Sequence, residues 1–249
     1  MPCFKEQTAA GGTAYGWAST NLMDWDCDMP KPATGRKNLG YRFEQIRLRK
    51  LASGAVIAGV DEAGIGPWAG PVVAAAVCLD PNNIPSGLAD SKLLSPQQRE
   101  RLFESIMITA AVGIGVADVA RIDRDNVLAA NHWAMAMAIS ELPRRPGLAL
   151  IDGLYAPAIG CPAEAVVDGD ASVASIAAAS IIAKVTRDRL MAILGQQFPG
   201  YGFARHKGYG TAAHREALER LGVAECHRRS YKPVKLVLAA QMAKVRVPR

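Results

Sequence analysis

The stretch that decides the fold is VIAGVDEAGIGPWAGPVVAAAVCLD, residues 56–80. Its first part, VIAGVD, is an apolar run rich in β-branched residues, and it stops at Gly64, Gly66 and Pro67, which are residues typical of turns. Its second part, PVVAAAVCLD, is another apolar run, and the turn-rich segment PNNIPSG ends it. The pattern predicts two successive strands joined by a turn.

Further along the chain, helical and strand patterns alternate. Ser95 and Pro96 predict a helix start, because serine is a favoured N-cap residue and proline fits the first helical turn. The remaining strand patterns are VGIGVADV, LALID and AEAVVD, and the remaining helical patterns are residues 123–142, residues 170–198 and HREALERL. Strands that come early and then alternate with helices are typical of an α/β domain with a mixed sheet.

The composition and periodicity predict the domain organisation. The chain has 249 residues, of which 50% are hydrophobic and 21% charged, so it is globular rather than disordered. Residues 1–40 show no sustained period. We therefore predict a poorly ordered N-terminal extension over residues 1–50, with a short helix in residues 41–51. The domain itself is predicted over residues 51–235, followed by a basic C-terminal tail over residues 236–249.

Several classes of protein are disfavoured by the sequence. The longest apolar run, Val72 to Leu79, is too short to cross a bilayer, and the N-terminus has no signal-peptide pattern. The five cysteines are scattered and form no C-x-x-C pair, which favours reduced thiols and a cytoplasmic location. The net charge of +6 is compatible with a polyanionic partner. No acidic residue follows Glu225, so the end of the chain could bind phosphates, but it could equally be a solvated tail.

Carboxylates follow predicted strands at separate points of the chain. Asp61 and Glu62 follow the first apolar run, Asp152 follows LALI, and Asp170 opens the longest helical pattern. Ligands of open α/β sheets gather at strand ends, and carboxylates that meet there repel one another unless a cation lies between them. Oxygen ligands favour magnesium or manganese, and two such ions ~3.5–4 Å apart can hydrolyse a phosphodiester.

Each of these carboxylates also has a plain structural interpretation. Asp170 could only cap a helix, Asp152 could only form a turn with the following glycine, and Glu62 could be a solvated strand end. Asp168 competes with Asp170, because both lie in VVDGD. Chain geometry adds a condition for Asp61, since neighbouring residues of a strand point to opposite faces. Asp61 and Glu62 can share a metal site only where the chain bends.

Together these residues closely resemble the ribonuclease HII family. The matching blocks are AGVDEAGIGPWAGPVVAAAV, LADSKLLSPQQRERL, IDRDNVLAANHWAM, LIDG, GDASVASIAAASIIAKVTRDRLM, FPGYGFARHKGYGT and HRRSYKPV. They follow the family's order from about Ile57 to Val234. The resemblance implies a ribonuclease H-like fold, which is a mixed five-stranded sheet flanked by helices, with a helical C-terminal part.

The resemblance also implies an activity and its metal ligands. The family cleaves the RNA strand of RNA–DNA hybrids and incises duplex DNA 5′ of single ribonucleotides, leaving 3′-hydroxyl and 5′-phosphate ends. Its two-metal site, with Mn²⁺ or Mg²⁺, uses four carboxylates, which fall here on Asp61, Glu62, Asp152 and Asp170. The resemblance thus favours Asp170 over Asp168.

The family's substrate-binding turn is present with one departure. The family reads the ribonucleotide 2′-hydroxyl with a glycine–basic–glycine turn and a tyrosine, which correspond here to Gly64, Ile65, Gly66 and Tyr209. Ile65 stands where Arg or Lys is usual, so the turn works through backbone groups or has lost one phosphate contact. Without the resemblance, Tyr209 would be a loop aromatic that covers the core. A second departure is Asp168, which stands where a basic residue is usual.

The implied partners are RNA–DNA hybrids and ribonucleotide-containing duplex DNA, with no membrane, for a monomeric enzyme. Lys92, Lys184, Arg187, Lys207, Arg228 and Arg229 also match family positions and are either phosphate contacts or ordinary surface charges. The related ribonuclease HIII normally carries an additional N-terminal domain, for which residues 1–50 are too short and irregular. A further alternative is a non-catalytic or impaired nucleic-acid-binding member, which Ile65 and Asp168 would support.

Overall fold

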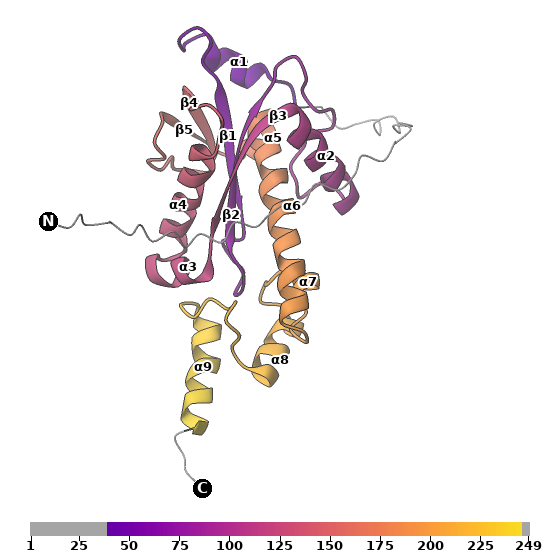
Figure 1. Ribbon diagram of the computed structural model, residues 1–249, viewed down its shortest axis with the longest axis vertical. Coiled ribbons are helices and arrows are strands. Elements are labelled where there is room, and N and C mark those ends of the chain that lie inside the picture. Colours follow the sequence, from indigo (N-terminus) through magenta and orange to yellow (C-terminus); the bar gives the residue numbers. More distant parts are fainter. Residues whose placement is uncertain (1–38, 246–249) are drawn as a thin grey trace, which may run out of the picture. The chain divides into compact units, whose positions relative to one another are not determined.

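The computed structural model describes residues 39–245 (Figure 1). Its strands are β1 (Ile57–Ala63), β2 (Val72–Leu79), β3 (Ala110–Ala117), β4 (Leu148–Asp152) and β5 (Ala163–Val166). Its helices are α1 (Arg42–Leu48), α2 (Pro96–Thr109), α3 (Val119–Asp125), α4 (Val127–Ser140), α5 (Gly169–Ser172), α6 (Ala174–Gln197), α7 (Phe203–His206), α8 (Ala212–Leu221) and α9 (Lys232–Val245). The predicted poorly ordered extension over residues 1–50 lies outside the described residues up to residue 38, and from Leu39 onward the segment packs against the core and forms α1.

The strands form one mixed sheet with the order β3-β2-β1-β4-β5. β1 pairs antiparallel with β2 and parallel with β4, while β2–β3 is antiparallel and β4–β5 is parallel. The predicted mixed five-stranded sheet is therefore confirmed. Because β1 and β4 are parallel neighbours, their C-terminal ends meet at the same edge of the sheet, where Asp61 and Asp152 lie.

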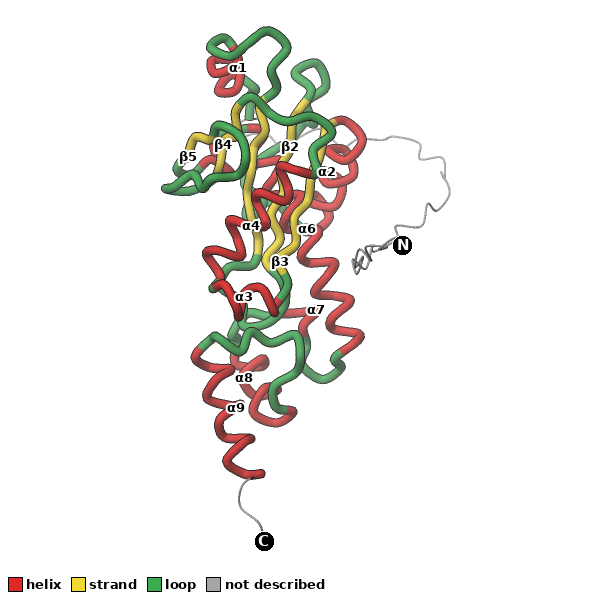
Figure 2. Tube along the Cα trace, turned by 60° about the vertical axis from the view of Figure 1, so that its left-hand side comes forward, coloured by secondary structure: helices red, strands yellow, loops and turns green. Residues whose placement is uncertain are grey.

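Helices cover both faces of the sheet. Ala75 and Val77 of β2 face a core shared with α2 and α6, whereas Ala74 and Ala76 face a core shared with α4. Figures 1 and 2 show α4 and α6 on opposite sides of the strands. The helices approach closely, since a Cβ at Gly59 of β1 would overlap the α6 backbone. The expected α/β fold with flanking helices is confirmed.

Two long helices predicted from the sequence are each broken in the structure. The pattern over residues 123–142 is divided at Asn126, which has φ 68° and whose side chain accepts hydrogen bonds from the first backbone N–H groups of α4. The pattern over residues 170–198 is divided at Val173, which has the extended angles φ −121° and ψ 120°. The prediction of one continuous helix was wrong in both places, because the hydrophobic pattern continues across each break.

The helix starts at Ser95 and in residues 41–51 are confirmed. Ser95 caps α2 in a reciprocal capping box with Gln98, and Pro96 is the first helical residue. Helix α1 occupies residues 42–48, and its Glu44 is fully buried. Glu44 accepts a 2.8 Å hydrogen bond from the Ser175 backbone N–H. Glu44 thus supplies the cap that α6 lacks, since the N-cap residue Val173 offers no side-chain acceptor.

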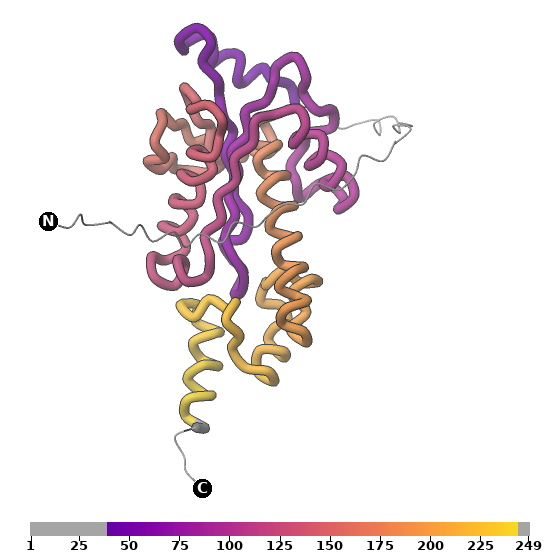
Figure 3. The backbone as a smooth tube through the Cα atoms, in the orientation of Figure 1, coloured from indigo at the N-terminus to yellow at the C-terminus, as the bar shows by residue number. Residues whose placement is uncertain are grey.

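The C-terminal part of the described chain is helical, as the resemblance implied. Figure 3 shows that the segment carrying α7, α8 and α9 lies beyond the end of the sheet, next to the connection between β1 and β2. Helix α9 contains the first ten residues of the predicted basic tail, up to Val245. Within residues 39–245, no helix has the length and apolar character needed to cross a membrane.

Candidate active site

Three carboxylates meet at the edge of the sheet where β1 and β4 end. One carboxylate oxygen from each of Asp61, Asp152 and Asp170 lies within 4.8 Å of the others. Asp61 belongs to β1, Asp152 is the last residue of β4, and Asp170 belongs to the short helix α5. Oxygen atoms at this spacing are a donor set suited to a divalent cation such as Mg²⁺ or Mn²⁺.

Hydrogen bonds hold α5 against the end of β4. Asp152 Oδ1 accepts from the backbone N–H groups of Gly169, at 2.8 Å, and Asp170, at 3.4 Å. Gly169 is confined, because a Cβ there would collide with Ile176. The peptide of Asp170 is therefore tied to Asp152, and its side chain is brought into the group although 17 residues separate Gly169 from Asp152.

Asp170 and Asp168 differ in their positions in the structure. The side chain of Asp170 is only 8% exposed and pairs with Lys92 rather than capping a helix. Asp168 is exposed and has the left-handed angles φ 51° and ψ 39°, at the turn between β5 and α5. Its position in this turn explains why β5 is shorter than the predicted strand AEAVVD.

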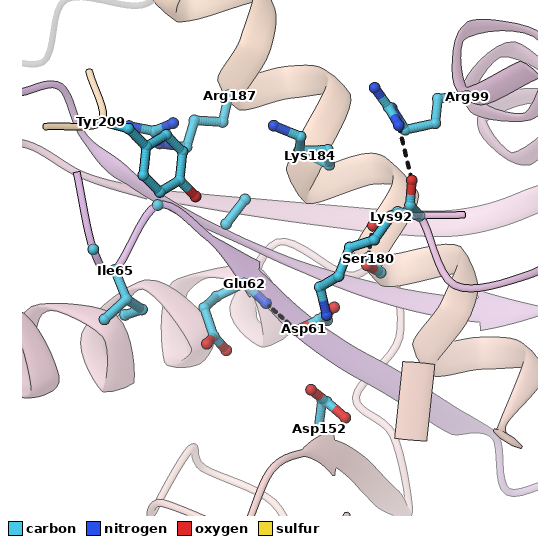
Figure 4. Close-up of a pocket in the computed structure, with 14 residues that line it drawn as sticks. Asp61, Glu62, Ile65, Lys92, Arg99, Asp152, Ser180, Lys184, Arg187 and Tyr209 are labelled. Carbon is cyan, nitrogen blue, oxygen red and sulfur yellow. Dashed lines mark hydrogen bonds between the residues drawn. The ribbon is translucent and has the colours of Figure 1, made fainter. Parts of the chain in front are cut away.

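Glu62 lies beside the three-carboxylate group without being part of it. Strand β1 continues regularly through Ala63, with Glu62 opposite Ala74, so the chain does not bend between Asp61 and Glu62. Figure 4 shows the two side chains pointing to different sides of β1. Both residues nevertheless line the same pocket. Burial raises the pKa of Glu62, and the side chain of Asn131 in α4 counteracts that rise.

Crowding and burial disfavour negative charge in this group. Burial, followed by repulsion from Glu62 and Asp152, raises the pKa of Asp61 well above its usual value. Burial and the nearby Asp170 also raise the pKa of Asp152. A divalent cation would relieve both the repulsion and the desolvation, so the residues fit the metal that their pattern predicts.

Lys92 is a functional candidate that sequence reasoning placed only among possible phosphate contacts. Its Nζ donates to Asp170 Oδ2 at 3.0 Å, and this hydrogen bond is the main reason that the pKa of Lys92 is raised. Its side chain is otherwise 78% exposed, so the ammonium group can leave the carboxylate without unfolding anything. The DSK sequence around Lys92 was the signal that pointed to this position.

The predicted substrate-binding residues lie in the same pocket, which has a volume of about 450 Å³. Gly64, Ile65 and Gly66 line it at the end of β1, and Tyr209 lines it from the loop between α7 and α8 (Figure 4). The turn and the ring are adjacent, because a Cβ at Gly66 would lie 3.9 Å from Cε1 of Tyr209. Tyr209 is 47% exposed, so its ring faces the pocket rather than serving only to cover the core.

The isoleucine of the turn is accommodated by apolar packing. Ile65 is half-buried and packs against the hydrophobic cluster that lies between the sheet and α4. Gly64 has φ 102°, and the Arg187 side chain fills the space where a Cβ would stand. A side chain is therefore accepted at position 65 but not at position 64.

Comparison with known proteins identifies the family. The model of the ribonuclease HII family matches residues 58–234. A ribonuclease HII of Azorhizobium caulinodans is 54% identical over 208 residues, which are 83% of this chain and 80% of the relative.

Solved structures agree with this result. Ribonuclease H2 of Pyrococcus horikoshii has a TM-score of 0.64 and 28% identity, and the match covers 74% of this chain and 97% of that one. Bst-RNase HIII in complex with Mn²⁺ has a TM-score of 0.62 at 23% identity, covering 80% of this chain and 73% of that one, which is a likeness of fold.

The fold and the carboxylate pocket are those of a metal-dependent hydrolase of the ribonuclease H class. The chain belongs to the ribonuclease HII family and is a metal-dependent endoribonuclease. Family membership supports ribonuclease H activity on RNA–DNA hybrids.

Proposed function

We propose that the protein incises duplex DNA on the 5′ side of a single embedded ribonucleotide, in addition to hydrolysing RNA in hybrids, and leaves 3′-hydroxyl and 5′-phosphate ends. One observation carries the proposal: a single open pocket is lined both by the carboxylates of Asp61, Glu62 and Asp152 and by the turn that faces Tyr209. A phosphodiester at the carboxylates would therefore have a neighbouring sugar beside the turn. The protein would then choose the bond by the sugar that it contacts.

The carboxylates are proposed to hold two metal ions. Asp61, Asp152 and Asp170 would hold one ion, and Glu62, which lies outside that group but lines the same pocket, would serve the second. When bound, Mg²⁺ or Mn²⁺ would activate a water molecule and stabilise the leaving 3′ oxygen. Lys92 would exchange its contact with Asp170 for a substrate phosphate, because its side chain is long and largely exposed.

The turn and the tyrosine are proposed to recognise the ribonucleotide. The 2′-hydroxyl is the group that distinguishes RNA from DNA at a given sugar. Gly64 and Gly66 let the backbone approach that sugar closely, while the exposed ring of Tyr209 stacks beside it. Ile65 contributes no charge, so recognition would depend on backbone groups of the turn.

A cleavage experiment with one substrate tests this proposal. A DNA duplex with one internal ribonucleotide is incubated with Mg²⁺ or Mn²⁺, and the products are mapped at nucleotide resolution beside those of Asp61→Asn. We expect one cut on the 5′ side of the ribonucleotide, absent in the variant. Cleavage of a longer hybrid without this cut would contradict single-ribonucleotide recognition. Binding of both substrates by folded protein without any cleavage would support the impaired alternative.

The remaining predictions concern the setting of the reaction. We propose a monomeric enzyme that acts in the cytoplasm, with residues 51–235 as its catalytic domain between an N-terminal extension and a basic tail. Sedimentation of the full chain with and without a hybrid duplex would test the monomeric state.

A further inference from the structure

Two arginines are buried against the Gly64–Gly66 turn. Arg187 of α6 is 1% exposed. Arg228, in the loop before α9, is 0% exposed. Among the described residues, neither guanidinium forms an ion pair with a carboxylate. Two buried cations without a neighbouring anion are costly, so their hydrogen bonds must be satisfied in another way.

Backbone carbonyl oxygens take the place of the missing carboxylates. Arg228 donates to four of them at distances of 2.5 to 3.2 Å, those of Gly64, Ile65, Gly70 and Pro71. Arg187 donates to the carbonyl oxygens of Pro71, at 3.0 Å, and Ala69, at 3.3 Å. The two side chains therefore hold both ends of the connection between β1 and β2.

A tyrosine completes the contact with the turn. The Tyr231 hydroxyl accepts a 3.0 Å hydrogen bond from Arg228 and donates a 2.6 Å hydrogen bond to the Ile65 carbonyl oxygen. The same carbonyl accepts a 2.7 Å hydrogen bond from Arg228. Both lone pairs of the Ile65 oxygen are therefore used, which fixes the orientation of the peptide that joins Ile65 to Gly66.

The direction of these carbonyls determines the direction of the neighbouring N–H groups. In a trans peptide, the N–H group points away from the carbonyl oxygen of the preceding residue. Since the carbonyls of Gly64 and Ile65 point to Arg228, the N–H groups of Ile65 and Gly66 point away from it. The turn lines the pocket and Arg228 does not, so these N–H groups are directed to the substrate side.

The same contacts join the turn to the tyrosine loop. The Arg228 backbone N–H donates to the Trp68 carbonyl, and the Trp68 N–H donates to the Gly208 carbonyl, both at 2.8 Å. Gly208 precedes Tyr209. The two parts of the predicted sugar-binding site therefore lie on one hydrogen-bonded unit, although about 140 residues separate them in the sequence.

We propose that Arg228, together with Tyr231, is a positioning residue for ribonucleotide recognition. It orients the N–H groups of Ile65 and Gly66 as donors to sugar and phosphate oxygens, and with Arg187 it places positive charge next to them. This arrangement explains how a turn with isoleucine in place of a basic residue can still favour an anionic strand. The inference rests on the proposed function, because it concerns the same recognition of a single ribonucleotide.

The test compares three variants on two substrates. Arg228→Lys keeps the charge but loses the planar set of donors, and Tyr231→Phe removes one hydroxyl without changing the packing volume. Arg229→Gln is the matched control, because Arg229 is the adjacent arginine and is exposed. For each variant, kcat and KM are measured on a duplex with one ribonucleotide and on a hybrid with a long RNA strand, and thermal melting confirms folding.

The variants of Arg228 and Tyr231 should differ from the Arg229 control in the ratio of kcat/KM between the two substrates. We expect Arg228→Lys and Tyr231→Phe to lose about tenfold or more in kcat/KM on the single ribonucleotide, with a much smaller loss on the hybrid. The reason is that one ribonucleotide offers one 2′-hydroxyl, whereas a hybrid offers one in every register. Arg229→Gln should reduce both substrates by the same modest factor, through KM.

Two results would overturn the inference. Equal losses on both substrates in variants that melt normally would mean that Arg228 has only a structural role. No loss in either variant would mean that these contacts do not position the turn. If Arg228→Lys fails to fold, Tyr231→Phe decides. Wild-type protein that cleaves the hybrid but not the single ribonucleotide would refute the proposed function instead, before any variant is considered.

Discussion

The two halves of the pocket carry opposite charge. The carboxylate half lies at the ends of β1 and β4, and the recognition half consists of the Gly64–Gly66 turn with the arginines against it. At the ends of β1 and β4, carboxylates are crowded, Lys92 is their one ion-pair partner among residues 39–245, and the pKa of Asp61 is strongly raised. Against the turn, two arginines are buried without a carboxylate partner in the described part of the chain, and burial and mutual repulsion lower the pKa of Arg187 to about 10. A bound cation would satisfy the first half, whereas the second is already satisfied by backbone carbonyls. Chemistry and recognition therefore depend on different kinds of interaction.

Removing one carboxylate should have the largest effect, which is a loss of kcat. We expect Asp61→Asn to lower kcat by about a thousandfold, because several kcal/mol of metal-dependent stabilisation are lost. Without metal, the same variant should melt at a higher temperature than wild type, since a buried, repelled carboxylate has been removed. Calorimetry with and without Mg²⁺ measures both states. A lower melting temperature in the metal-free variant would contradict the electrostatic account of this half.

A fall in pH should lower the stability of the fold next to the recognition half, where two buried histidines lie. His227 Nδ1 accepts from the Ala224 N–H, so its Nε2–H donates to His214 Nε2 at 3.1 Å, and His214 Nδ1–H donates to the Tyr209 carbonyl. Burial lowers the pKa of His227 to about 4 and also lowers that of His214. Both imidazoles are therefore neutral in the folded protein at neutral pH.

The sign of the pH effect follows from these lowered values. The unfolded chain binds protons below pH ~6.5, so stability present above that pH is lost as the pH falls towards 4, by on the order of 3 kcal/mol for His227. Denaturant unfolding between pH 4 and 7 measures the slope. His227→Gln should flatten it. An unchanged slope in His227→Gln would remove this explanation.

A pair of glycine substitutions separates backbone strain from ordinary contact in the turn. Gly64→Ala should cost about 2 kcal/mol or more of unfolding free energy, because φ is 102° and Arg187 fills the space of the new Cβ. Gly66→Ala should cost much less, since its Cβ would meet only Tyr209 at 3.9 Å. Chemical denaturation of both variants provides the comparison. Equal costs would show that the arginine does not confine Gly64.

Adding a charge to the turn should have the smallest effect. Ile65→Arg keeps a long apolar stem against the cluster at α4 and adds one cation at the pocket. We expect duplex affinity to rise a few-fold at low salt, with the slope of log affinity against log salt steeper by about one. Fluorescence anisotropy at several salt concentrations measures this slope. A rise in affinity that is independent of salt would point to packing instead of phosphate contact.

The sequence predicts the carboxylate half better than the recognition half. Asp61 and Asp152 could be predicted to lie together, because ligands gather at strand ends and parallel neighbouring strands end at one edge of the sheet. The resemblance selects Asp170. The breaks at Asn126 and Val173 were missed, since neither interrupts the apolar pattern. The cap that Glu44 supplies to α6 was missed as well, because the contact spans 131 residues.

The burial of Arg228 could not be predicted from the sequence. Arg228 and Arg229 are adjacent and chemically identical, yet one is fully buried against Gly64 and the other is exposed. Only the tertiary fold distinguishes them, since the contacts of Arg228 with the turn span more than 150 residues. Local pattern and charge counts give both arginines the same interpretation as basic surface residues.

The most direct test of the account measures Asp61→Asn and Tyr231→Phe side by side, each on the single-ribonucleotide duplex and on the long hybrid. The account predicts that Asp61→Asn loses cleavage of both substrates, because the metal-binding half serves every phosphodiester. It predicts that Tyr231→Phe loses mainly the single-ribonucleotide cut and keeps cleavage of the hybrid. If both variants lose the two activities in the same proportion, the division of the pocket into a chemical half and a recognition half is wrong.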